Sequence, residues 1–96
     1  MEQIFINCLN TGEEDPETGK SWISNYHILR KRKGLSTSFS CIHCDASPVE
    51  GCHVRPRLSS AVYIVPMCHD CNTSLRQVRI DDFWAEPVNE VSEACS

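Results

Sequence analysis

Four of the seven cysteines in this chain of 96 residues form two Cys-x-x-Cys pairs. The first pair is Cys41 and Cys44, and the second is Cys68 and Cys71. Two intervening residues let both sulfurs of a pair turn toward one ion, and four thiolates complete the tetrahedral coordination of a structural zinc site. An odd number of cysteines that includes two such pairs indicates metal ligation with leftover thiols. We therefore expect one structural zinc ion per chain, held by these four cysteines.

The alternative chemistry for the two pairs is reversible disulfide formation. A redox Cys-x-x-Cys motif belongs to a thioredoxin-like βαβ unit, and this sequence lacks that pattern. A chain of this length also buries a thin core and needs a staple, which favours zinc. His43 and His69 lie inside the pairs, and we expect them to be exposed, with replacement of a cysteine ligand as the alternative. Three other cysteines are scattered and are expected to be leftover thiols: Cys8, Cys52 and Cys95.

The segments on either side of the cysteine pairs must form elements that bring the pairs together. We expect a short strand at 2–9, where Ile and Phe are consecutive, followed by a polar loop. Apolar residues then recur at helical spacing, which predicts a helix from Trp22 to about Lys33 with Ser21 as its N-cap. Gly34 stands where a glycine commonly ends a helix.

After the first cysteine pair, apolar and β-branched residues at 49–54 and 61–67 indicate the two strands of a hairpin. The second pair is expected to begin a short helix that runs over 70–78. The remaining apolar residues are expected to pack back as a final strand or an extended arm: Ile80, Phe83 and Trp84. The predicted fold class is therefore α+β, a small fold stapled by zinc.

We expect a single zinc-binding domain over 1–86 and an acidic, flexible tail over 87–96. The first residues do not combine a basic segment with a long apolar run, as a signal peptide would. No stretch approaches the roughly 18 apolar residues of a membrane span. Together with the leftover thiols, these features favour a soluble protein of the reducing cytoplasm that makes no membrane contact.

Charge is distributed unevenly along the chain, whose formal net charge is −4. Residues 21–80 carry eight Lys or Arg against three Asp or Glu, whereas the segments 1–20 and 81–96 carry five acidic residues each. Four thiolates on one Zn²⁺ would lower the excess of the basic middle from +5 to about +3. The middle can therefore contact nucleic acid, but an isoelectric point near 5.4 argues against strong non-specific DNA binding.

The segment from Cys41 to Asn72 resembles the HNH, or ββα-metal, family of zinc-containing endonuclease domains, and within it a subgroup of small bacterial and phage proteins. The resemblance covers about one third of the chain. It rests on Cys-Ile-His-Cys at 41–44, Gly-Cys-His-Val at 51–54 and Tyr-Ile-Val-Pro-Met-Cys-His-Asp-Cys-Asn at 63–72. A double cysteine pair alone is common among zinc ribbons and treble clefs, whereas its combination with the other boxes is more specific. The resemblance implies a treble-clef, HNH-like ββα core, here with an additional N-terminal strand and helix.

The resemblance also implies roles for single residues. His53 matches the general base of active members, and Asn72 stands where a final histidine completes the site of the catalytic cation. Cys52 occupies the position of an Asp or His metal ligand, and Tyr63 that of an asparagine that orients the base. Cys52 and Asn72 are poor ligands for magnesium, because a thiolate is too soft and one amide carbonyl is neutral. The sequence thus retains the base but lacks the usual cation ligands, and a structural role for His53 stays open.

Four arginines are candidate contacts to nucleic acid. Arg55 and Arg57 lie in the loop of the expected hairpin, which in an HNH domain runs near the DNA backbone. Arg76 and Arg79 are expected to project from the second helix toward a minor groove. For all four the alternative is an ordinary solvated side chain. The run 30–33 can likewise contact DNA or simply place favourable positive charge at a helix C-terminus.

Three functions are compatible with these observations. The first is a zinc-stapled, HNH-like module that binds nucleic acid weakly, most readily DNA, with weak or absent phosphodiesterase activity. The second is an active metal-dependent DNA endonuclease that uses His53, with a second divalent ion beside it. The third is a small phage-type adaptor or inhibitor that binds a host protein. The missing cation ligands favour the first, and the sequence leaves open whether the chain is an enzyme.

Overall fold

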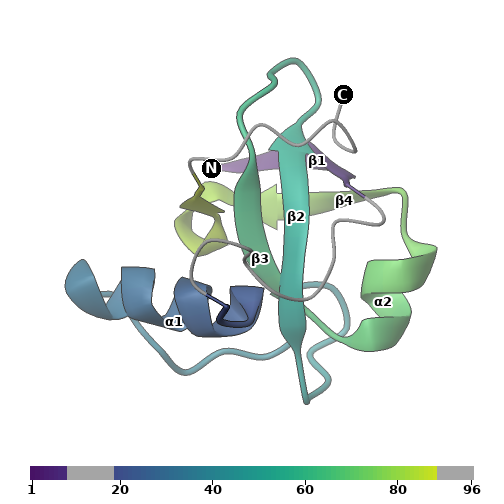
Figure 1. Cartoon of the computed structure of the whole chain (residues 1–96). Helices are drawn as coiled ribbons and strands as arrows, with labels where there is room; N and C mark the ends of the chain where they lie inside the picture. Colours follow the sequence, from purple (N-terminus) through teal and green to yellow (C-terminus); the bar gives the residue numbers. More distant parts are fainter. Residues whose placement is uncertain (9–18, 89–96) are drawn as a thin grey trace.

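Five strands form one antiparallel sheet in the computed structural model, which describes residues 1–8 and 19–88 (Figure 1). The strands are β1 (Glu2–Asn7), β2 (Glu50–Pro56), β3 (Tyr63–Met67), β4 (Gln77–Asp81) and β5 (Glu86–Pro87). Their order across the sheet is β4-β1-β2-β3-β5. The predicted N-terminal strand and hairpin are confirmed, and β1 pairs with both β2 and β4, which joins the two ends of the described chain.

Alternation along β2 divides the sheet into two faces. Cys52 pairs with Val65, and both belong to the main apolar cluster of the molecule. The next residue, His53, pairs with Ile64 and points to the opposite side, because successive side chains of a strand alternate. We call the side that carries Cys52 the cysteine face and the side that carries His53 the helix face. The main core, built from β1, β2, β3 and β4, lies on the cysteine face.

The predicted first helix is confirmed as α1 (Trp22–Arg32) and lies on the helix face. It begins after Ser21, whose hydroxyl accepts a hydrogen bond from the backbone N–H of Ser24 at 3.3 Å. α1 crosses β2 at Gly51, where a Cβ atom would stand 2.6 Å from Trp22 Cβ. A side chain at Gly51 would therefore push α1 away from the sheet.

Arg30 ties the end of α1 to the C-terminal part of the chain. Its side chain is 0 % exposed, and its Nη1 lies 3.2 Å from Glu86 Oε2. The guanidinium also stacks on the rings of Phe83 and Trp84, at 4.8 and 4.7 Å from their centroids. Lys33 reaches the second Glu86 oxygen at 2.7 Å. Two members of the basic run 30–33 are therefore structural.

The C-terminal part departs from the expected pattern. The second helix, α2 (His69–Ser74), ends earlier than the predicted 70–78, and β4 follows it. Val78 and Ile80 are buried while their neighbours are exposed or partly exposed, and this period of two belongs to a strand. A 3₁₀ turn, η1 (Asp82–Trp84), then leads into β5.

The first two residues of the expected tail, 87–88, contact the sheet. Pro87 pairs with Tyr63 in the sheet, and the backbone N–H of Val88 donates to the carbonyl of Val62 at 3.0 Å. The other residues of the expected tail, 89–96, lie outside the described part of the chain. Within residues 1–8 and 19–88, no helix has the length and apolar character needed to cross a membrane.

We expect Glu86→Gln to destabilise the fold, because it leaves the buried guanidinium of Arg30 without a counter-charge. Removal of one partner of a buried ion pair costs about 3–5 kcal/mol. Urea unfolding measures the loss. Lys31→Gln is the matched control, because Lys31 is exposed on the same helix and its replacement should change the unfolding free energy by less than about 0.5 kcal/mol. Equal effects of the two substitutions would contradict the structural role of Glu86.

Candidate metal centre

The four cysteines of the two pairs converge on one point. Their Sγ atoms all lie within 4.8 Å of one another, and Cys44 Sγ is 3.6 Å from Cys68 Sγ. A tetrahedral zinc with bonds of about 2.3 Å places its sulfur ligands about 3.8 Å apart. The cluster therefore has the dimensions of a four-cysteine metal site, and the predicted grouping of Cys41, Cys44, Cys68 and Cys71 is confirmed.

Two backbone turns position these cysteines. In the first, the N–H of Asp45 donates to the Cys41 carbonyl at 2.9 Å, and Asp45 adopts a left-handed conformation with φ of 66°. The N–H of Ile42 donates to the Pro66 carbonyl at 2.9 Å, which pins this turn to the end of β3. Cys68 directly follows β3 and is the N-cap residue of α2, so the chain delivers both pairs to the same end of the hairpin.

The surroundings shift the pKa values of Cys41 and Cys71 in opposite directions. Burial raises the pKa of Cys41, but backbone N–H groups of Cys68, Cys44 and His43 outweigh it and lower that pKa to about 6. Desolvation and hydrogen bonds with the three neighbouring thiols raise the pKa of Cys71. Thiols this close cannot all ionise without a cation between them, whereas a divalent ion would stabilise four thiolates together.

A polar network links the cluster to the sheet. Asn72 Nδ2 donates to Glu50 Oε1 at 2.6 Å, and His69 Nδ1 lies 3.3 Å from the same carboxylate. Asn7, on β1, donates to the carbonyls of Asn72 and Leu75, both at 2.8 Å. α2 is thus held by residues from two strands. No role for Glu50 or Asn7 was expected from the sequence. The one available signal was that Asn7, a polar residue, directly follows the apolar run of β1.

Cys52 is enclosed in the core on the cysteine face. It is 0 % exposed, and its thiol donates to Asn7 Oδ1 at 3.3 Å. Burial, followed by the charges of Glu50 and Cys41, raises the pKa of Cys52 to about 12. A protonated, buried thiol is a poor metal ligand, so Cys52 acts here as a core residue. Cys8 is disulfide-bonded, so its expected role as a leftover thiol is wrong, and Cys95 lies outside the described residues.

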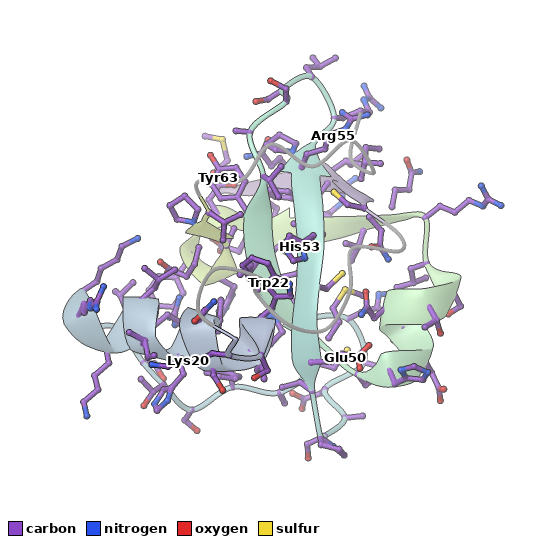
Figure 2. The ribbon with its side chains drawn as sticks, viewed as in Figure 1. Lys20, Trp22, Glu50, His53, Arg55 and Tyr63 are labelled. Carbon is purple, nitrogen blue, oxygen red and sulfur yellow. The ribbon has the colours of Figure 1, made fainter. Side chains whose placement is uncertain are left out.

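His53 and Asn72 do not share a surface. His53 is 1 % exposed on the helix face and packs edge to face against Trp22, with 4.4 Å between ring centroids. Figure 2 shows this pair at the middle of β2, with Glu50 at the end of the strand near α2. Asn72 bonds Glu50, which shares the cysteine face with Cys52 because the two are separated by one residue on β2. The expectation that His53 and Asn72 form one site is therefore not supported by their positions.

The candidate nucleic-acid contacts also separate. Arg55 and Arg57 follow His53 at alternate positions and so lie on the helix face, beyond the part that α1 covers. Arg79, which was expected on the second helix, lies on β4 and joins them, because it pairs with Ile4 and the N–H of Arg57 donates to the Ile4 carbonyl at 3.1 Å. Arg76 is exposed just before β4, at an even-numbered position like the core residues Val78 and Ile80, so it does not belong to this group.

Comparison of the chain with protein-family models, curated proteins and solved structures finds no match. Among residues 1–8 and 19–88, the four-cysteine cluster is also the only group of three or more His, Cys, Asp or Glu side chains close enough to hold one ion. The assignment of this cluster as a candidate metal centre therefore rests on its geometry and on the chemistry of its four sulfurs.

We expect Cys41→Ser to abolish metal retention and to unfold the region around the hairpin, because metal-binding energy at such a site is folding energy. Zinc content after dialysis and the dispersion of the amide NMR spectrum measure both effects. Cys52→Ser is the matched control, since it changes a buried cysteine outside the cluster and should keep one zinc per chain. A well-dispersed spectrum of metal-free Cys41→Ser protein would contradict this expectation.

Cys52 should resist alkylation in the folded protein and react after unfolding, because its thiol is buried and its pKa is raised to about 12. A raised pKa means that folding favours the protonated thiol. Its stabilising contribution is complete below the pKa of an ordinary thiol and is lost as the pH rises toward 12. Peptide mass spectrometry after iodoacetamide treatment at pH 8 tests the resistance to alkylation. Urea unfolding between pH 8 and 10.5 measures the loss of stability with pH, which should be shallower for Cys52→Ser.

Proposed function

We propose that this protein is a zinc-stapled module that binds nucleic acid weakly through arginines on the helix face. The observation that carries the proposal is the cross-strand register of β4, β1 and β2. Arg57 and Arg79 flank Ile4 on either side of β1, and Arg55 and Gln77 flank Ile6 in the next row. We call these six residues the arginine face.

The arginine face suits a polyanion. Arg57 and Arg79 are exposed, while Ile4 and Ile6 are partly buried between them. Guanidinium groups donate two hydrogen bonds to a phosphate in a fixed geometry, and half or more of protein–DNA hydrogen bonds go to the backbone. Two or three such contacts give weak binding, with a slope of log K against log salt of about −2 to −3. The net charge of −4 also favours weak binding.

The HNH resemblance remains part of the proposal. The order of β2, β3 and α2, with the second cysteine pair at the start of α2, is compatible with a ββα core of that family. Cleavage would need a base and a bound cation acting on one phosphate. Because His53 is buried under α1 and Asn72 lies on the other face, we propose binding without magnesium-dependent cleavage. A host protein as partner is the alternative for the same face.

Replacing Arg57 and Arg79 together by Ala should weaken binding to a fluorescent DNA duplex and lower its salt dependence. Each lost phosphate contact should reduce the slope of log K against log salt by about 1, so the double variant should lose about 2. Fluorescence anisotropy from 20 to 200 mM salt measures both quantities.

Arg32→Ala is the matched control for this experiment, because Arg32 is exposed in the last turn of α1 and lies outside the arginine face. It should leave the affinity and the salt slope nearly unchanged. Equal losses with Arg32→Ala would show that only net charge matters. Absence of binding by the unaltered, zinc-loaded chain to DNA or RNA would overturn the proposed function and favour a protein partner.

A further inference from the structure

The hairpin between β2 and β3 ends in an exposed leucine. Leu58 is 92 % exposed and lies between Arg57 and two small residues, Ser59 and Ser60. Figure 1 shows that the loop joining these strands projects beyond the rest of the sheet, at the top of the view. Because Arg57 is a member of the arginine face, the tip of the hairpin is a continuation of that face.

Hydrogen bonds, and not packing of Leu58, hold this loop in shape. Arg55 Nη1 donates to the carbonyls of Pro56 and Arg57, both at 3.3 Å, and of Ser59 at 3.4 Å. The N–H of Ser59 donates to the Pro56 carbonyl at 3.1 Å, and Ser59 Oγ accepts from Ala61 N at 3.1 Å. Arg55 therefore braces the loop from below. The chain thus presents one large apolar side chain at the end of a supported β-arm.

We propose that Leu58 acts as a wedge that enters a DNA duplex from the minor groove and partly separates two neighbouring base pairs. The inference depends on the proposed function, since Arg57 and Arg79 must first hold the phosphates on either side. DNA-bending proteins insert an apolar side chain between base pairs in this way. The unstacked step kinks the duplex, and the bent duplex contacts more protein surface. The small residues after Leu58 allow the loop backbone to approach the groove closely.

The charge pattern selects DNA over an apolar protein groove as the occupant. Binding in an apolar protein groove would be favoured by several apolar residues at the tip, whereas Leu58 is a single apolar residue beside Arg57 and two hydroxyl groups. The Arg55 brace also fixes the tip without burying Leu58, so its exposure does not arise from a loose loop. A wedge needs just these properties, namely one apolar side chain, a fixed support and neighbouring positive charge.

The test uses the full, zinc-loaded chain and a duplex that carries 2-aminopurine at its central step, whose fluorescence rises when the base unstacks. The same duplex with dyes at its ends reports bending by energy transfer. Leu58→Ser removes the wedge, Leu58→Met keeps a flexible apolar side chain, and Ser60→Ala is a control on the same loop. A second duplex with a one-nucleotide gap at the centre supplies a step that is already weakened.

Unaltered protein, Leu58→Met and Ser60→Ala should all raise the 2-aminopurine signal and bend the duplex. Leu58→Ser should still bind with the same salt slope, but with about tenfold lower affinity for the intact duplex and no gain in fluorescence. Its loss should be smaller on the gapped duplex, where unstacking costs less.

Two other outcomes would overturn the wedge. If Leu58→Ser binds and unstacks as the unaltered protein does, while Arg57→Ala with Arg79→Ala weakens binding, the arginine face binds DNA without a wedge. If the unaltered chain binds no duplex at all, both the proposed function and the wedge fail. Circular dichroism of Leu58→Ser should match the unaltered protein, because Leu58 is exposed.

Discussion

The convergence of four cysteine sulfurs is the constraint on which the rest of this structure depends. Cys44 and Cys68 are separated by 23 residues, all of which form the hairpin and its approaches. One ion bound by both pairs would fix where the hairpin starts and where α2 begins. The free energy of binding zinc at structural sites, about 10–16 kcal/mol, is as large as the whole stability of a small domain. Zinc can therefore decide whether the sheet forms.

The second constraint is the alternation of β2. The strand sends Glu50 and Cys52 toward the metal centre and sends His53 under α1, so adjacent residues serve unrelated parts of the molecule. Cys52 and His53, which are neighbours in one sequence motif, therefore lie on opposite faces of the sheet and do not form one site. The same alternation places Arg55 and Arg57 on one side of the sheet, where β4 adds Arg79. A functional surface arises from the register of three strands that are distant in sequence.

Features that depend on the local spacing of residues could be predicted from the sequence. The cysteine pairs, α1 with its Ser21 cap, and the β2–β3 hairpin could all be predicted, because ligand spacing, helical periodicity and β-branched residues are local signals. The burial of Arg30 could not, since it needs Glu86 and two aromatic rings from 53 or more residues away. The separation of His53 from Asn72 likewise depends on a contact between α2 and β2, the hydrogen bond of Asn72 to Glu50, whose partners are 22 residues apart.

X-ray absorption at the zinc edge combined with metal removal tests most directly whether a metal bound by four cysteines organises the fold. We expect four sulfur neighbours at about 2.3 Å and one zinc per chain. A strong chelator should abolish the dispersed amide spectrum, and added zinc should restore it. Nitrogen or oxygen neighbours in place of sulfur, or an unchanged spectrum after complete removal of the metal, would contradict a zinc-organised fold.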